Sequence, residues 1–356
     1  MTAVGFSAGP DLSALPAYKP EMTVVGGVRL YGAYLKFTLV PLEEGFKKFH
    51  PGVIFSNNFI PSSEGAVAGL YTGLGDLAPA GDDIKITEMM AYHEMFQCLP
   101  LEVSVATGGY EARGTLWPAV IVVNKDNPIA GLTMDQLDRV FGAQRTGGFD
   151  DQGMVFTAKY GRGPETNIRT WGQLGLTGEW ADKTITTYGY GPGGFPEYFC
   201  RKLMHKVQKW NPTYREYQET HAMIDIRGAT EEEKKYMEPI SSEQMLVDMA
   251  NDRYSIGWAA IMHTKTATGV RPVAIAAKEG APFVALTPET DANRTYPLVR
   301  DAYIYVNKFP GKPLDPKVRE FLRFILSREG QEIVASVGSY FPLTPEYLQA
   351  QLHKLD

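Results

Sequence analysis

The sequence has only two cysteines among 356 residues, Cys98 and Cys200, far apart and in no metal-binding spacing. Both have apolar, helix-like neighbours, which favours two buried free thiols. A disulfide between them stays open as an alternative, and it would have to join different parts of the chain. No histidine pair has the spacing of zinc ligands. The sequence therefore indicates neither a metal centre nor a cofactor.

Positive charge is also scarce, with 35 lysines and arginines against 41 acidic residues and a net charge of −6. Since no basic block occurs, a nucleic-acid partner or an anionic membrane surface is not expected. No apolar run has the length of a membrane-spanning helix. The first residues lack the charged start and apolar stretch of a signal peptide. We interpret the chain as a mature one whose leader has been removed; a cytoplasmic protein is the alternative.

Catalytic motifs are missing as well. No Gly-x-Ser-x-Gly elbow is present. The Gly-x-Gly-x-x-Gly spacing at 189–194 fits a dinucleotide fingerprint, but a proline lies inside it and no acidic strand end follows at the expected distance. Asp82, Asp83 and Cys200 are the groups that an enzyme could use. Adjacent carboxylates usually face different ways, and Cys200 has apolar neighbours, so structural roles are favoured.

The first hundred residues alternate between strand and helix patterns, with strands near 28–31, 53–55 and 75–83. Such alternation predicts an α/β fold with a mainly parallel sheet and helices on both faces. In such sheets ligands bind at the carboxyl ends of the strands. The polar candidates at these ends are Tyr34, Lys36, Ser62, Ser63, Asp82 and Asp83.

Two apolar strands at 116–124 and 296–307 resemble each other and both close with Val-Asn. Two such strands could be the crossover connections by which the chain passes from a first lobe into a second and back. The length of the chain also favours two domains. We therefore predict lobe one at 1–118 and 298–356, and lobe two at 119–297. Residues 142–168 read as a glycine-rich insertion, in which Arg162 is expected to be solvated, as is Arg169 just after it.

Two further local signals are capping patterns. Thr133 and Gln136 form a capping box that predicts a helix start. Asp315 and Pro316 predict the N-cap and first residue of another helix.

The most informative stretch is 184–199, where a β-branched run stops at a glycine turn and a helical pattern follows. A turn that opens a helix offers unpaired N–H groups and the positive end of the helix dipole, which suit a small anion. Packing and ligand contact are equally open for the tyrosine side chains beside this turn. The candidate contacts here are Tyr190, Gly193, Gly194 and Phe195.

Seven segments carry recognisable motifs: Val122–Pro128, Gly131–Phe141, Thr170–Gly175, Ile256–Trp258, Arg300–Asn307, Phe321–Gln331 and Gly338–Leu343. Together they resemble the phosphate-binding-protein family of ABC-importer solute-binding proteins. The resemblance implies a two-lobe periplasmic-binding-protein fold of type II. Each lobe would be a mixed, mainly parallel sheet flanked by helices, and two crossover strands would join the lobes.

The resemblance also implies a function: a non-catalytic, monomeric, periplasmic or extracellular receptor that holds phosphate or a related oxyanion between its lobes. Its partners would be the membrane subunits of an ABC transporter. The alternatives are a diverged member that senses or docks a partner, a receptor for a neutral or organic ligand, and an enzyme that uses the cleft.

The ligand motifs depart from the family pattern in both lobes. Tyr190 stands where the family has the arginine of its Arg-x-x-x-Ser-Gly-Thr turn, and 193–195 stands for Ser-Gly-Thr. The family's Gly-Ser-x-Thr corner becomes Gly32–Lys36, in which Lys36 is either a plain surface lysine or an anion contact. The family's ligand aspartate is lost unless Asp82 takes its place.

Overall fold

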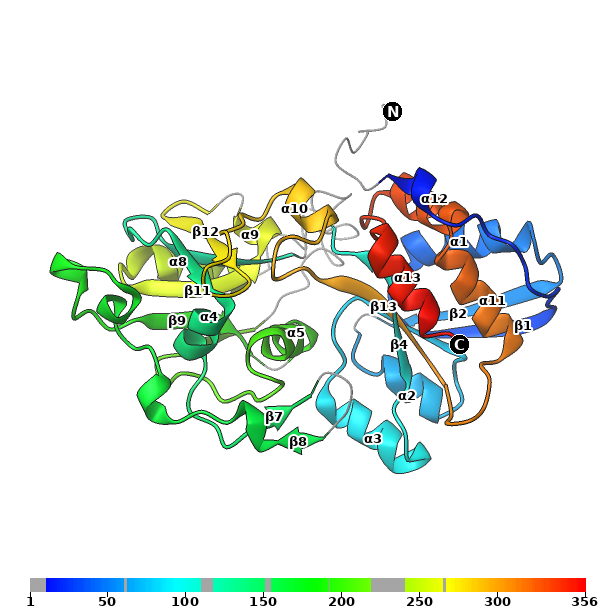
Figure 1. The fold of residues 1–356 in the computed structure, drawn as a ribbon, viewed down its shortest axis with the longest axis horizontal. Helices are drawn as coiled ribbons and strands as arrows, with labels where there is room; N and C mark the ends of the chain where they lie inside the picture. The colour runs from blue at the N-terminus through cyan, green and yellow to red at the C-terminus, as the bar shows by residue number, and fades with distance from the viewer. Residues whose placement is uncertain are drawn as a thin grey trace, which may run out of the picture. The chain divides into compact units, whose positions relative to one another are not determined.

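The computed structural model describes residues 11–60, 63–109, 118–150, 155–191, 193–218, 241–264 and 267–356. By its internal contacts the chain divides into two compact units. Unit 1 comprises Met1–Thr115, Thr287–Thr295 and Val299–Asp356, and unit 2 comprises Leu116–Leu286 and Tyr296–Leu298. Each unit holds a sheet flanked by helices (Figure 1), so the predicted α/β fold is confirmed. Within the described ranges, no helix is both long enough and apolar enough to cross a bilayer.

Unit 1 is built on a five-stranded sheet in the order β2-β1-β3-β13-β4. β1 pairs in parallel with β2 and β3, whereas β13 is antiparallel to both β3 and β4. The carboxyl ends of β1, β2 and β3 therefore lie at one edge of the sheet. The strands are β1 (Gly26–Ala33), β2 (Val53–Ile60), β3 (Leu77–Ala80), β4 (Leu101–Thr107) and β13 (Asp301–Val306).

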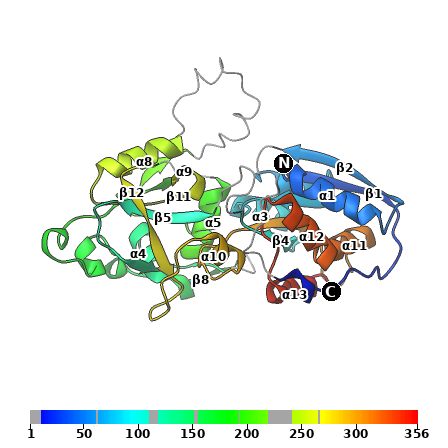
Figure 2. The ribbon, with the colours of Figure 1, turned by 90° about the horizontal axis from the view of Figure 1, so that it is seen from above.

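Two hydrophobic clusters cover the two faces of this sheet. Along β13, Ile304 and Val306 belong to the larger cluster, whereas Tyr303 and Tyr305 belong to the smaller one, as strand alternation requires. The larger cluster lies under α1, α11, α12 and α13, and the first three of these helices pack against one another (Figure 2). The smaller lies under α2 and α3. The helices are η1 (Leu12–Ala14), α1 (Lys36–Lys47), α2 (Ala66–Tyr71), α3 (Ile86–Phe96), α10 (Pro288–Ala292), α11 (Pro316–Ile325), α12 (Arg328–Val337) and α13 (Pro345–His353).

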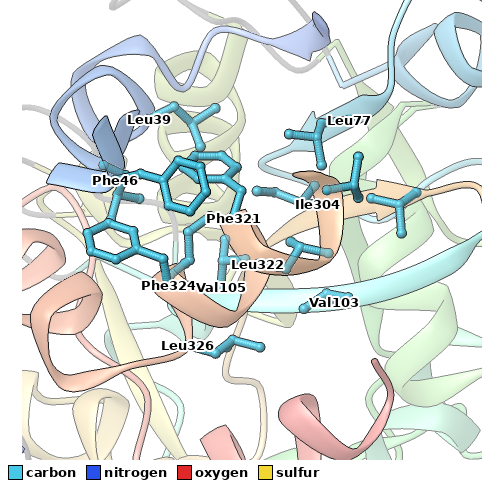
Figure 3. Packing of buried hydrophobic residues seen from close by; sticks show 14 of the residues in the cluster. Leu39, Phe46, Leu77, Val103, Val105, Ile304, Phe321, Leu322, Phe324 and Leu326 are labelled. Atoms are coloured by element: carbon cyan, nitrogen blue, oxygen red, sulfur yellow. The ribbon is translucent and has the colours of Figure 1, made fainter. Parts of the chain in front are cut away.

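The larger cluster is rich in phenylalanine. Phe46 of α1 lies 5.2 Å from Phe321 and 5.7 Å from Phe324 between ring centroids, and all three side chains are buried. Such tilted and edge-on pairs add to the stabilisation from burial. Figure 3 shows these rings with aliphatic neighbours from the sheet, including Leu77, Val103 and Ile304. The periodic apolar residues of the sequence thus account for this core.

Unit 2 is built on a six-stranded sheet in the order β10-β9-β11-β5-β12-β6, with β5 antiparallel to both of its neighbours. Its strands are β5 (Ala119–Asn124), β6 (Gly131–Thr133), β9 (Thr186–Tyr190), β10 (Arg215–Tyr217), β11 (Ser255–Ala260) and β12 (Val270–Ala276). The helices among its described residues are α4 (Met134–Phe141), α5 (Gly194–Leu203), α8 (Ser241–Asn251) and α9 (Ile261–Thr264). The described part of unit 2 also has a small ribbon and four 3₁₀ turns: β7 (Gly148–Phe149), β8 (Phe156–Thr157), η2 (Ala158–Tyr160), η3 (Pro164–Thr166), η4 (Trp171–Leu174) and η5 (Gly178–Trp180).

Both predicted helix starts are confirmed. The Thr133 side chain accepts from the Gln136 N–H at 3.1 Å, and the Gln136 side chain accepts from the Thr133 N–H at 2.9 Å. Asp315 caps α11 by accepting from Lys317, and Pro316 is the first helical residue. The helix starts can be predicted from the sequence because the donor and the acceptor of each cap lie within four residues of each other.

The units differ from the predicted lobes by a few boundary residues, 116–118 and Leu298, and by one longer segment. Residues 287–295, which carry α10, were predicted in lobe two but belong to unit 1. Arg294 explains this, since it donates to Thr107 at 2.9 Å and pairs with Asp301 of β13 at 2.5 Å. Arg294 thus connects this segment with the sheet of unit 1. The rest of the predicted division remains a prediction.

The expectation that Arg162 and Arg169 are solvated is wrong. The Arg162 side chain is 9% exposed and donates to the Asp138 carbonyl at 3.0 Å. Arg169 donates to the carbonyls of Arg139 and Gly142, both at 2.9 Å. These carbonyls end α4, and cations at a helix C-terminus satisfy orphan carbonyls and oppose the dipole. Both arginine side chains therefore cap the C-terminal end of α4 instead of lying in solvent.

Both cysteines are free thiols. Cys98 is half-buried and Cys200 is fully buried, in agreement with the favoured interpretation for Cys200. Burial raises the pKa of each thiol.

The segment before β1 is attached to the rest of unit 1 through a chain of buried hydrogen bonds. The Tyr18 hydroxyl donates to Glu320 at 2.6 Å and lies 2.8 Å from His50 Nε2. His50 Nδ1 accepts from the Val24 N–H at 3.3 Å. Because Nδ1 accepts, the ring proton is on Nε2 and His50 is neutral. Burial lowers the pKa of His50, and the Glu320 carboxylate opposes that shift only in part.

This arrangement predicts a loss of stability in mild acid. The pKa of His50 is lower in the folded protein than its ordinary value of 6.5, so the unfolded chain takes up the proton first as the pH falls. The free energy of unfolding should therefore decrease from about pH 7 to about pH 5. In His50→Gln this decrease should be smaller, as measured by urea denaturation at each pH. His93→Gln, which changes an exposed histidine, is the control; equal slopes in all three proteins would contradict the assignment.

Candidate functional site

The candidate site of unit 1 lies where β1 passes into α1, beside the end of β3. Gly32 packs against Pro79 so closely that a Cβ on Gly32 would come within 2.4 Å of the Pro79 carbonyl oxygen. Leu35, the N-cap of α1, lies next to Gly81: a Cβ on Gly81 would be 3.6 Å from Leu35 Cδ2. The start of α1 and the end of β3 are therefore neighbours, as the parallel pairing requires.

Ser63 fixes the turn after β3. It is 4% exposed, and its Oγ accepts from the N–H groups of Gly81 at 3.0 Å and Asp82 at 3.1 Å. Its hydroxyl proton is still available as a donor. The structure thus brings Ser63 and Asp82 together, as expected for one ligand corner. Ser62 lies outside the described residues.

Asp82 forms an ion pair with Arg300. Arg300 is not among the site residues predicted from the sequence. Arg300 is 3% exposed, and burial lowers its pKa to about 10, so it keeps its charge at neutral pH. A buried guanidinium must be paired, and the carboxylate of Asp82 meets that need. The sequence does contain an indication of this role: Arg300 lies between Val299 and the apolar strand β13, and a cation in such a buried context is expected to have a counter-ion.

Lys36 is the first residue of α1 and is exposed. The N-cap residue Leu35 makes no side-chain hydrogen bond to the helix, so no serine- or aspartate-type cap occupies its positive end. The Thr38 N–H donates to the Leu35 carbonyl at 3.0 Å, whereas the N–H groups of Lys36 and Phe37 precede the first intrahelical bond. Tyr34, directly after β1, is 44% exposed at the same edge. Cation, helix N-terminus and tyrosine therefore meet at one corner.

The glycine turn of unit 2 is packed more tightly than expected. Phe195 is fully buried, with its ring centroid 5.6 Å from Tyr190 and 5.0 Å from Trp258. Tyr190 is 1% exposed. The side chains of Tyr190 and Phe195 therefore serve the aromatic core of unit 2. What this turn can offer a ligand is backbone: Gly193 is the N-cap of α5, followed by the N–H groups of Gly194 and Phe195.

Two residues reduce the capacity of this turn for an anion. Pro196 follows in the first turn of α5 and has no N–H to donate. Glu197 is 7% exposed, lies in the same turn, and accepts from Gln208 Nε2 at 2.6 Å. A carboxylate there interacts favourably with the helix dipole and offsets the positive potential that an anion would use. Ligand contacts at Gly193, Gly194 and Phe195 stay predictions.

No metal centre is evident in the part of the chain that the structure describes, where no group of three or more histidine, cysteine, aspartate or glutamate side chains could hold an ion. The chemistry that the unit 1 corner offers is hydrogen bonding and charge.

The Asp82–Arg300 pair predicts a non-additive stability effect. Asp82→Asn leaves the Arg300 charge buried without its counter-ion, so the free energy of unfolding should fall by about 3 kcal/mol. Arg300→Met should lower the free energy of unfolding by a similar amount, because the Asp82 carboxylate then lacks its counter-ion. The double variant should lose clearly less than the sum, as measured by urea denaturation. Additive losses would show that the two groups do not interact.

Comparison with known proteins finds sequence relatives over nearly the whole chain. The profile of the PBP superfamily domain matches residues 116–329. The chain is 31% identical over 344 residues to the phosphate-binding protein PstS of Pseudomonas aeruginosa, covering 96% of this chain and 91% of that protein.

Solved structures with a similar backbone fold were also found. One is a possible phosphate-binding protein from Planctomyces limnophilus, at 18% identity and a TM-score of 0.46, covering 94% of this chain and 98% of that one. Another is PstS from Borrelia burgdorferi, at 16% identity and a TM-score of 0.49, covering 89% and 99%. The sequence match is the stronger of the two kinds of similarity, because it spans both chains at 31% identity.

Proposed function

Because the chain belongs to the PBP superfamily, and within it to the phosphate-binding proteins related to PstS, we propose that it is the solute-binding protein of an ABC importer and binds phosphate or a related oxyanion. It would act as a monomer outside the cytoplasmic membrane and present its ligand to the membrane subunits of the transporter. The relatives that match it are phosphate-binding proteins by name.

The observation that carries this proposal is the uncapped start of α1 beside the end of β3. Lys36 supplies a positive charge there, the first N–H groups of α1 supply donors, and Ser63 can donate its hydroxyl proton. Small oxyanions favour such a combination of helix N-terminus, cation and hydroxyl. The backbone of Gly194 and Phe195 is the corresponding candidate contact in unit 2.

The enzyme alternative is weaker on chemical grounds. Cys200 is fully buried, and burial raises its pKa well above the ordinary thiol value, so the nucleophilic thiolate is disfavoured. Asp82 is engaged in an ion pair with the buried Arg300, which favours a structural role for its carboxylate. We therefore propose binding without turnover.

The proposal predicts anion binding that depends on Lys36. Calorimetric titration should detect binding of inorganic phosphate, and Lys36→Ala should weaken it about tenfold through loss of a charged contact. Raising the ionic strength should weaken binding further, since exposed charges are screened.

Lys48→Ala is the matched control, because Lys48 is an exposed lysine at the opposite end of the same helix. It should leave phosphate affinity unchanged. If phosphate, sulfate and small organic acids all failed to bind, the transport proposal would be refuted in favour of a sensing or docking role. An equal loss in both lysine variants would remove Lys36 from the site.

A further inference from the structure

Asp291, on the short helix α10, is a carboxylic acid that unit 1 buries without a hydrogen-bond partner. The residue is fully buried, at 0% exposure. Neither of its two carboxyl oxygens has a hydrogen-bond partner among the described residues. Buried polar groups are normally hydrogen-bonded, and an ionised carboxylate in such a place would be especially costly. The environment of Asp291 therefore favours the neutral, protonated carboxyl group.

The arginine that acts on Asp291 is already engaged with other groups. Arg294 pairs with Asp301 Oδ1 at 2.5 Å and donates to Thr107 Oγ1 at 2.9 Å. Its guanidinium carbon also lies 3.6 Å from the ring centroid of Tyr347. One guanidinium thus stands beside two carboxyl groups, and its hydrogen bonds go to Asp301.

Asp301 of β13, unlike Asp291, receives several hydrogen bonds. Its Oδ2 accepts from Ser104 Oγ at 2.9 Å and from the Tyr347 hydroxyl at 2.7 Å, in addition to the pair with Arg294. Donors of this kind stabilise the charged form of a carboxyl group, so Asp301 is the ionised member of the two. Burial raises the pKa of Asp291 well above its ordinary value of 3.8; the Arg294 charge opposes this shift and the Asp301 charge adds to it.

The segment that carries Asp291 has a strained backbone near these contacts. Arg294 has a φ of 62°, a left-handed conformation that is uncommon for residues other than glycine. Such a conformation persists only where surrounding interactions maintain it. In the chain, segment 287–295 belongs to unit 1 but lies between Leu286 and Tyr296, which belong to unit 2. A change that weakens the Arg294 contacts would therefore release strain in a segment that unit 2 residues flank on both sides.

We propose that Asp291 is a proton-dependent switch that controls the attachment of segment 287–295 to the sheet of unit 1. With its proton, the neutral carboxyl group stays buried and Arg294 stays paired with Asp301. When the pH rises, the proton passes to solvent, and the carboxylate that remains competes with Asp301 for Arg294 and favours exposure to water. The segment then detaches from the sheet. The inference is independent of the proposed ligand.

The first test follows the titration of Asp291 directly, by carbon NMR of its carboxyl group in the full chain between about pH 4.5 and pH 9. A single titration step of this carboxyl group should occur within that range. A carboxyl group that stays ionised throughout the range, or that stays protonated throughout it, would overturn the inference.

The second test measures stability by urea denaturation over the same pH range. Because the folded protein holds the Asp291 proton more tightly than the unfolded chain, the native state should lose stability as the pH rises toward the titration midpoint. Asp291→Asn cannot ionise and keeps the size of the side chain. Relative to this variant, the unfolding equilibrium constant of the wild type should increase about tenfold per pH unit below the midpoint.

Glu289→Gln is the matched control, because Glu289 is an exposed carboxylate of the same helix. It should follow the wild-type pH profile. Parallel profiles of the wild type and Asp291→Asn would overturn the inference.

The third test locates the detachment by hydrogen exchange, corrected for the intrinsic effect of pH on the exchange rate. Peptides that cover 287–295 should lose protection above the midpoint in the wild type and keep it in Asp291→Asn. Peptides from α1 should show no such change. Loss of protection spread evenly over unit 1, or none in 287–295, would overturn the assignment. If Asp291→Asn failed to fold, the wild-type titration and exchange would still decide.

Discussion

The ion pair between Asp82 and Arg300 is the interaction on which the candidate site depends. It joins the end of β3 to the start of β13, and it keeps a buried guanidinium from standing without a counter-ion. It also engages the Arg300 guanidinium, a donor that an oxyanion receptor could otherwise direct at its ligand, while Ser63 accepts from the adjacent turn and keeps its hydroxyl proton. What remains for a ligand is the start of α1, with Lys36 and its exposed aromatic neighbours.

The two helix N-termini show how the same backbone dipole leads to different chemistry. α1 begins without a side-chain cap and carries an exposed cation, so its positive end is available. α5 begins at a glycine turn, but Pro196 removes a donor and Glu197 supplies a carboxylate in the same turn. Its aromatic side chains pack into the unit 2 core. The sequence pattern favours the glycine turn as the anion site, whereas charge and exposure in the structure favour the start of α1.

How far the sequence predicts this protein depends on the range of the interactions. The capping box at Thr133 and the N-cap at Asp315 were predictable because their partners are a few residues away. The α/β alternation was predictable from periodicity. The burial of Arg162, the pairing of Arg300 and the attachment of α10 depend on contacts with residues distant in the sequence. Composition indicates only that such cations need partners, not which partners they find.

We propose that the start of α1 binds the anion. The most direct test follows backbone amide resonances by NMR during a phosphate titration. Binding at this helix start should produce saturable shifts of the Lys36 and Phe37 amides and little change for Lys48, at the far end of the same helix. Phosphate binding that leaves the Lys36 and Phe37 amides unmoved would contradict it.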